Sequence, residues 1–134
     1  MNYIFCIEKN KGLTFFGKRQ SEDSILREWI LNYVNGAKLW VSRYTATQFK
    51  DTATIMIDDD YAHKAEENDF CWVEDKPYDI SLASQVIVCN WNRRYPADKF
   101  FKEDLKALGF KKIKKEEIKG SSHDKITIEI YQRR

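Results

Sequence analysis

The sequence predicts an α/β fold in which one mixed sheet is covered by helices, in a single domain over residues 1–134. Short apolar segments that look like strands alternate with segments that look like helices. The run QVIVCN at 85–90 is almost wholly apolar, as in a strand covered on both faces. The chain also ends in two strand-like segments joined by a polar turn, which indicates a C-terminal antiparallel hairpin.

The first elements expected are a strand, a loop and a helix. Residues 2–8 form an apolar run that the turn-like KNKG closes, and FFGKRQ at 15–20 is expected to be an exposed loop. A helix is predicted over 21–35, where apolar residues recur at three- and four-residue spacing. Ser21 is the expected N-cap of this helix, and Gly36 is its expected stop.

Four further strands are predicted in the middle of the chain. The first two are separated by a short helical turn near TATQF, so this part reads β-α-β. The second ends at the acidic triplet 58–60, which we interpret as a solvated helix start because it lacks the spacing of a calcium loop. The four strands are expected at 38–43, 52–57, 69–74 and 85–90.

The last third of the chain is predicted to hold a helix and the hairpin. Pro96 suits the opening of a helix that ends at Gly109, and its buried side would carry Phe100, Phe101, Leu105 and Leu108. Strands are expected at 110–118 and 125–132. In the polar turn between them, Ser121, Ser122 and Asp124 are expected to bond to nearby backbone.

Composition and charge exclude several classes of protein. No apolar run is long enough to cross a bilayer and the N-terminus lacks a basic signal region, so a soluble, cytoplasmic chain without membrane contact is expected. The three cysteines form no C-x-x-C pair and only two histidines are present, so we expect buried thiols and no metal site. Residues 99–134 carry a net charge of +5 and residues 1–98 carry −3, a weak indication of a basic face.

The segment NWNRRY is the strongest candidate site, because it follows the strand at 85–90, where ligands of α/β sheets tend to bind. The arginines suit a phosphate or carboxylate, the aromatic side chains suit stacking on a base, and the amides suit hydrogen bonds to its edge. In the alternative reading, the aromatic residues cap the core and one arginine pairs with Asp98 or Asp104. The candidates are Asn90, Trp91, Asn92, Arg93, Arg94 and Tyr95.

The order of these motifs resembles a shortened dihydrofolate reductase. The strand IFCIEKNKGL, the helix start QSEDSILREW, LWVSRYTATQF, VIVCNWNRRYPADKFF and the ending ITIEIYQRR are similar to that family. The resemblance implies that Asp23 faces a pterin and that Ser42, Arg43 and Thr45 lie on a cofactor-binding turn. However, Ser42 replaces one glycine at which phosphates approach the backbone, and Asn90 and Trp91 replace a Gly-Gly pair.

The chain also resembles short bacterial proteins, some of which carry the name ribonuclease Z, through NDFCWVED, WNRRYPAD and GSSHDKIT among other segments. Two separated histidines cannot form the H-x-H-x-D-H cluster that the zinc nuclease needs. The adjacent Ser, His and Asp of GSSHDK do not suit a catalytic triad, since consecutive turn residues rarely converge. His123 is still a candidate acid or base, and Asp23 is either a first-turn carboxylate or a pocket acid.

Three functions follow from these observations. The first is a non-catalytic binding or protein-interaction module on a reduced reductase-like scaffold, without a cofactor and with a protein partner or a small anionic ligand. The second is an NADPH-dependent reductase of a pterin-like or nucleotide-like substrate that uses Asp23 as proton relay. The third is an RNA-binding protein or metal-independent ribonuclease that uses NWNRRY, His123 and the lysine-rich tail.

Overall fold

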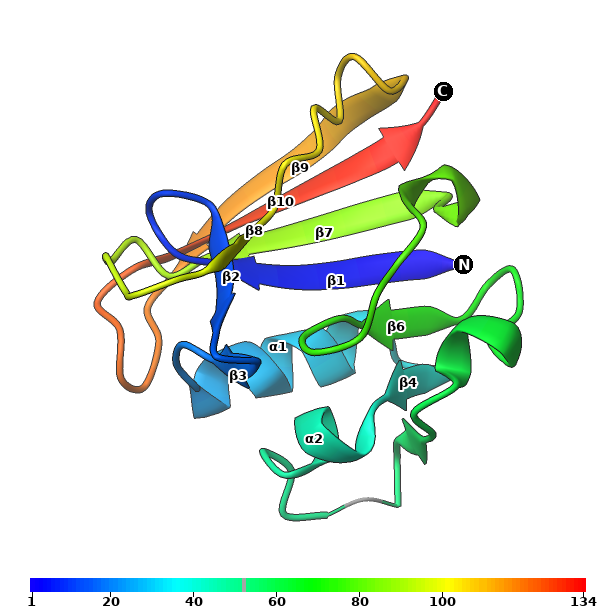
Figure 1. The fold of residues 1–134 in the computed structure, drawn as a ribbon, viewed down its shortest axis with the longest axis horizontal. Coiled ribbons are helices and arrows are strands. Elements are labelled where there is room, and N and C mark those ends of the chain that lie inside the picture. Colours follow the sequence, from blue (N-terminus) through cyan, green and yellow to red (C-terminus); the bar gives the residue numbers. More distant parts are fainter. Residues whose placement is uncertain (52) are drawn as a thin grey trace.

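The computed structural model describes residues 1–51 and 53–134. In that part of the chain, a seven-stranded mixed sheet has the order β5-β4-β6-β1-β7-β10-β9, and a smaller sheet has the order β3-β2-β8 (Figure 1). The strands are β1 (Asn2–Ile7), β2 (Gly12–Phe15), β3 (Lys18–Arg19), β4 (Leu39–Val41), β5 (Met56–Ile57), β6 (Phe70–Trp72), β7 (Gln85–Asn90), β8 (Lys99–Phe100), β9 (Phe110–Ile118) and β10 (Ile126–Arg133). The helices are α1 (Ser24–Tyr33) and α2 (Arg43–Ala46), with 3-10 turns η1 (Tyr61–His63) and η2 (Ile80–Leu82).

The large sheet confirms the predicted α/β class and the C-terminal antiparallel hairpin. β1 pairs in parallel with β6 and β7, whereas β10 pairs antiparallel with β7 and β9. The central strands β1 and β7 are buried along nearly their whole length, as the apolar runs NYIFCI and QVIVCN predict. No helix in the described ranges is long and apolar enough to span a bilayer.

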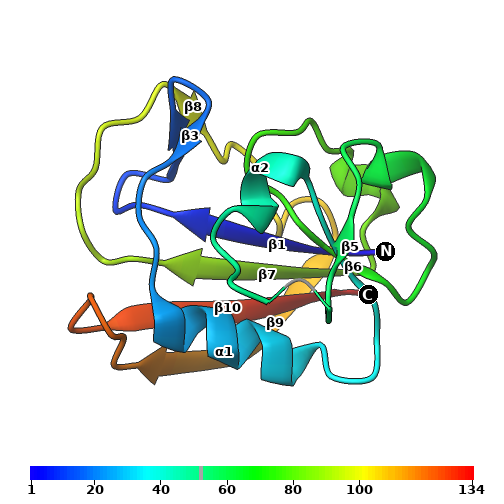
Figure 2. The same ribbon diagram turned by 90° about the horizontal axis from the view of Figure 1, so that it is seen from below.

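Two hydrophobic cores lie on the two faces of this sheet. On one face, Leu26 and Ile30 of α1 pack among Ile87 and Ile128 of the sheet. On the other face, Phe5 packs with side chains of the segment that follows β8. Figures 1 and 2 show α1 on one side of the sheet and the small sheet on the other. Each fully buried side chain of this size contributes about 1.5–3 kcal/mol through removal of apolar surface from water.

The helix predicted from Pro96 to Gly109 is wrong, because this segment pairs with β2 instead. The amide of Asp98 donates to the carbonyl of Thr14 at 3.1 Å, and the amide of Phe101 donates to the carbonyl of Lys11 at 2.8 Å. Phe100 is 40% exposed and Phe101 is 5% exposed, the alternation of an extended strand. Strand pairing therefore overrides a helical spacing of apolar residues.

Other boundaries also differ from the prediction. The segment 15–20, expected as a loop, forms a hairpin of β2 and β3, in which Phe16 and Gly17 adopt positive φ values of 51° and 73° as a type I′ turn requires. The third predicted strand, 52–57, shortens to β5, and its first residue lies outside the described residues. The helix expected at 21–35 shortens to α1, whose N-cap is Asp23 and not Ser21.

Candidate functional site

The carboxylate of Asp23 caps α1 and binds the turn between β9 and β10. Its Oδ1 accepts hydrogen bonds from the amides of Ile25, Leu26 and Ser121 at 3.0, 3.2 and 2.9 Å. Its Oδ2 accepts from the amide of Ser122 at 2.9 Å. Burial alone would raise the pKa of Asp23, but the hydrogen bonds from the turn outweigh it and hold that pKa well below its usual range. Asp23 is therefore an ionised carboxylate that the protein itself saturates with donors.

His123 lies beside this carboxylate and is 3% exposed. Its Nδ1 is 3.0 Å from Asp23 Oδ2, and its Nε2 is 3.0 Å from the hydroxyl of Tyr95 and 3.2 Å from Oγ of Ser21. The imidazole stacks on Trp91 with ring centroids 4.5 Å apart. The ionised Asp23 favours a proton on Nδ1, which leaves Nε2 as an acceptor for the two hydroxyls.

The turn that carries His123 makes close contact with the start of α1. A Cβ added at Gly120 would lie 2.2 Å from Asp23 Oδ2, so only glycine fits at this position. Ser121 Oγ accepts from the amide of Ser24, and Ser122 Oγ donates to a carbonyl at the start of α1. The prediction that Ser121 and Ser122 bond to nearby backbone is wrong, because both residues bond to a segment about 100 residues earlier.

The structure brings four of the predicted site residues together and leaves the others apart. Asp23, His123, Trp91 and Tyr95 form one cluster, which we call the Asp23–His123 cluster and which also includes Ser21. Sequence reasoning treated Asp23 and His123 as separate candidates. Their approach depends on the hairpin turn reaching the helix start, a contact that sequence spacing does not reveal.

The remaining polar residues of NWNRRY hold the loop in place or face solvent. Asn90 Oδ1 accepts from the amide of Asn92, and Asn92 Nδ2 donates to the carbonyl of Lys125 at 3.1 Å. Arg93 and Arg94 are exposed. The alternative reading is right that the aromatic residues pack on the core, since Trp91 is buried in it and Tyr95 packs against it. Its pairing of one arginine with Asp98 or Asp104 is wrong: neither arginine forms an ion pair with an acidic residue in the described part of the chain. Asp98 instead accepts from the amide of Phe16, and Asp104 from that of Ala107.

Ser42, Arg43 and Thr45 form the start of α2. Ser42 Oγ accepts from the amide of Thr45 at 3.0 Å and donates to Asp75 Oδ1 at 2.7 Å. Thr45 is fully buried, whereas Arg43 is exposed and its amide donates to Asp59. In this structure the three residues therefore stabilise a helix start.

Little free space remains beside Ser21 and Trp91. A cavity there has a free volume of about 10 Å³, which is room for one water molecule at most. Arg19 and Glu74 both line this cavity, and Arg19 binds the carboxylate of Glu74 through Nε and Nη2, at 3.0–3.1 Å. Sequence reasoning missed this pair, although an acidic residue directly after a buried strand is a recognisable signal for Glu74.

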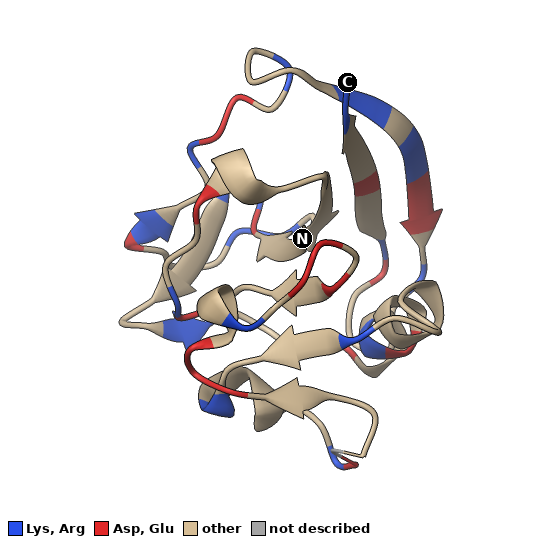
Figure 3. Cartoon of the chain, turned by 90° about the vertical axis from the view of Figure 1, so that its right-hand side faces the viewer, with Lys and Arg blue, Asp and Glu red and all other residues tan. Residues whose placement is uncertain are grey.

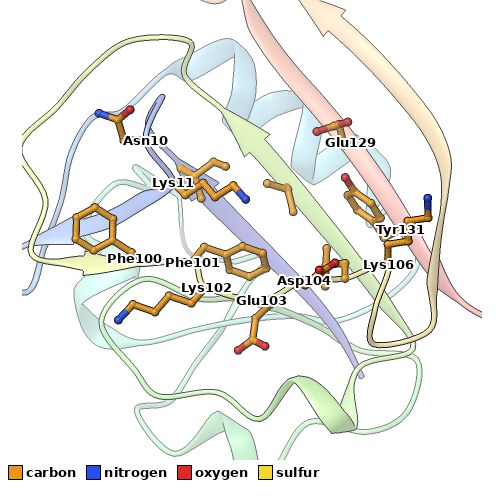
Figure 4. A pocket seen from close by; sticks show the side chains of 13 residues that line it. Asn10, Lys11, Phe100, Phe101, Lys102, Glu103, Asp104, Lys106, Glu129 and Tyr131 are labelled. Carbon is orange, nitrogen blue, oxygen red and sulfur yellow. The ribbon is translucent and has the colours of Figure 1, made fainter.

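Two larger grooves lie on either side of the segment that contains β8. One has a volume of about 680 Å³ and runs between this segment and β10, with Phe101 and Tyr131 in its wall (Figure 4). The other has a volume of about 740 Å³ and includes Tyr78. Phe100, Lys102 and Glu103 line both grooves, so we call them the β8 grooves. The sequence analysis missed them because it predicted a helix here.

Neither groove is a metal centre by composition. Over residues 1–51 and 53–134, no three His, Cys, Asp or Glu side chains gather in a group that could hold a metal ion. The three cysteines are free thiols, of which Cys71 and Cys89 are buried and Cys6 is half-buried. Burial raises the pKa of Cys71 to about 12, so this thiol is unreactive at neutral pH.

Comparison with known proteins identifies the fold. A scan against models of protein families finds no match, and a search of the curated proteins finds none either. Among solved structures, the chain is similar to a dihydrofolate reductase from Enterococcus faecalis, solved in complex with NADP(H) and RAB-propyl. The TM-score is 0.63 at 13% identity, over 98% of this chain and 95% of the other. The chain therefore has a dihydrofolate reductase-like fold.

Proposed function

We propose that this protein acts by binding a partner and not by nicotinamide-dependent reduction. The observation that supports this most is the contrast in space: about 10 Å³ beside Ser21 and Trp91, near the Asp23 carboxylate, against about 680 and 740 Å³ in the β8 grooves. A small-molecule site usually needs about 300–1,000 Å³. A pterin-like ring has no room in the first space, and all the oxygen atoms of Asp23 already accept hydrogen bonds from the protein.

The character of the grooves favours a protein partner over a small anionic ligand. The wall they share offers Phe100, which is 40% exposed, next to Lys102 and Glu103. The charged side chains that line the first groove are three lysines and three acids, so no excess of positive charge selects an anion. An exposed aromatic residue with a mixed charged rim is typical of protein interfaces.

The RNA alternative has less support. Several lysines of the C-terminal hairpin already have acidic partners: Lys112 pairs with Glu129, Lys114 Nζ lies 3.6 Å from Glu116, and Lys125 Nζ lies 3.1 Å from a further glutamate. Figure 3 shows the basic residues along most of β9 and the acidic ones at its C-terminal end. Strong binding to phosphates requires unpaired basic side chains on one face.

A site-specific crosslink tests the binding proposal. A photoreactive phenylalanine analogue at position 100 would be compared with the same analogue at Ile113, which is 54% exposed on β9, an edge strand of the large sheet that does not include β8. We expect position 100 to give one defined crosslinked protein in the source cell and Ile113 not to give it. Identical products from both positions would contradict the proposal.

A ligand screen tests the reductase alternative directly. NADPH and dihydrofolate, each at about 100 times a plausible Kd, would raise the unfolding free energy by roughly 2.7 kcal/mol if they bind the folded chain. We expect no change in Tm with either compound or with single-stranded RNA. A shift with NADPH that is lost in Trp91→Ala would restore the reductase reading.

A further inference from the structure

Ser21, His123 and Asp23 are arranged as a serine hydrolase triad. We propose that Ser21 is a nucleophile activated by His123 and Asp23, and that the chain accepts an acyl group from an ester of an apolar acid and hydrolyses it. This inference goes beyond the binding function, since it adds a reaction at a different place from the β8 grooves.

The atoms meet in the order that the relay requires. Ser21 Oγ is 3.2 Å from His123 Nε2, and His123 Nδ1 is 3.0 Å from Asp23 Oδ2. In serine hydrolases the nucleophile contacts one ring nitrogen and the carboxylate contacts the other. Ser21 lies in the loop before α1, Asp23 is the N-cap of α1, and His123 lies in the β9–β10 turn. The objection to a triad of consecutive GSSHDK residues therefore does not apply to these three.

The surroundings hold the imidazole in the productive orientation. Trp91 stacks on the ring at an interplanar angle of 24°, and both oxygens of Asp23 are fixed by backbone amides. A carboxylate anchored in this way keeps the Nδ1 proton and stabilises the imidazolium that forms when Nε2 takes a proton. The ring is buried, whereas Ser21 itself is half-buried at the surface of the cluster.

A hollow of about 310 Å³ adjoins this cluster beside Tyr95 and Gln20 and would hold the acyl group, although Ser21 itself does not line it. Tyr95 of the cluster lines it, together with Phe15, Phe16 and Pro96 and with the polar Lys18, Arg19 and Gln20, of which Gln20 precedes the nucleophile. Phe16 is 77% exposed, so apolar surface is available there for a ligand. The Oε1 atom of Gln20 is buried without a hydrogen-bond partner in the described residues, which leaves one unused acceptor at this place.

The hydroxyls of Tyr95 and Ser21 compete to donate to the lone pair of His123 Nε2. Its hydroxyl is 3.0 Å from His123 Nε2, closer than Ser21 Oγ. A phenol is a stronger donor than an alkyl hydroxyl, so Tyr95 holds Nε2 in the resting protein. Substrate in the hollow lined by Tyr95 would displace this hydroxyl, and Nε2 would then accept a hydrogen bond from Ser21 Oγ alone. Removal of the tyrosine hydroxyl should therefore increase the reactivity of Ser21.

The reaction consists of two balanced steps. Ser21 Oγ attacks the ester carbonyl carbon while its proton passes to His123 Nε2, and the alcohol leaves with that proton as the acyl–oxygen bond breaks. Water then attacks the acyl-serine ester, gives its proton to Nε2 and releases the acid, and the proton returns to Ser21 Oγ. No oxidant or cofactor is consumed.

The experiment labels the full chain with a biotinylated fluorophosphonate, which an activated serine hydroxyl attacks with loss of fluoride. We expect one label per chain, located on Ser21 by peptide mass spectrometry, and none in Ser21→Ala. Ser24→Ala, which removes an exposed hydroxyl three residues away, is the matched control and should label normally. His123→Gln should slow labelling by roughly 100-fold or more, and Tyr95→Phe should accelerate it.

Release of p-nitrophenolate from p-nitrophenyl butyrate should follow the same order among the variants. Absence of label on Ser21 in both the parent chain and Tyr95→Phe would overturn the proposal, as would labelling that survives Ser21→Ala. Ser21→Ala and Tyr95→Phe remove only hydroxyls, so they keep the test valid if His123→Gln does not fold. The crosslink at position 100 does not involve Ser21, so each proposal can fail without the other.

Discussion

Asp23→Asn should destabilise the fold strongly, because it removes the charge on which the helix start and the hairpin turn converge. In the parent chain Oδ1 accepts three amide donors, and Oδ2 accepts from the Ser122 amide and from His123 Nδ1. An asparagine can keep its oxygen at only one of these positions. Its NH₂ group then faces the donors at the other, and at least the Ser122 amide loses its partner.

The magnitude follows from these contacts. One buried amide without a partner costs about 1–3 kcal/mol, and each remaining hydrogen bond weakens because bonds to charged groups are worth about 1.5–3 kcal/mol against about 1 for neutral ones. We expect a total loss of about 3–5 kcal/mol, as when one partner of a buried ionic cluster is removed. For a chain of this size that corresponds to a fall in Tm of roughly 10–20 °C.

Urea unfolding followed by tryptophan fluorescence would measure this loss. Asp124→Asn is the matched control, since Asp124 is an exposed acid on the same turn and should change the unfolding free energy by less than about 0.5 kcal/mol. The pKa of Asp23 is lowered in the folded state, so its stabilisation is present above the ordinary Asp pKa and is lost as pH falls through the lower folded value. A loss under about 1 kcal/mol, or an unchanged acid dependence in Asp23→Asn, would refute this reasoning.

Three other substitutions should also change stability in urea unfolding. Gly120→Ala should cost about 1–3 kcal/mol because its Cβ would press on Asp23, and a parent-like midpoint would show that the turn can move away. Glu74→Ala should cost about 3–5 kcal/mol because it removes the buried partner of the Arg19 guanidinium and leaves only the 3.7 Å pair with the exposed Glu22, whereas Arg19→Met with Glu74→Gln should recover part of that loss. Leu26→Ala should cost about 2–5 kcal/mol as a core truncation, and exposed Ile25→Ala should cost far less.

The sequence could predict those parts of the fold that depend on local pattern. Apolar runs located the central strands β1 and β7, and the two C-terminal runs around a polar turn predicted the β9–β10 hairpin correctly. The helix predicted after Pro96 failed for a non-local reason. Amides of this segment donate to carbonyls of β2 and of the loop before β2, more than 80 residues earlier. The spacing of apolar residues does not reveal that such distant strand pairing competes with a helix.

The candidate site shows the same limit at the level of single residues. The sequence singles out Asp23 and His123 only as unrelated candidates, and it assigns Ser21 the capping role that Asp23 performs. Capping statistics favour serine and aspartate alike, so they cannot choose between positions two residues apart. The choice is made by the turn at 120–123, whose amides need an anion and find it only at Asp23.

The Asp23–His123 cluster explains how this dihydrofolate reductase-like fold satisfies a buried carboxylate with its own residues. A buried carboxylate near the start of the first helix is costly unless donors satisfy it. Here the donors are supplied by the chain, from the amides of Ser121 and Ser122 and from His123, so the carboxylate stabilises the folded state without any ligand. That arrangement fixes the tautomer of His123 and places Nε2 beside two hydroxyls. The contacts that satisfy the Asp23 carboxylate are thus the same contacts that would prepare Ser21 for acyl transfer.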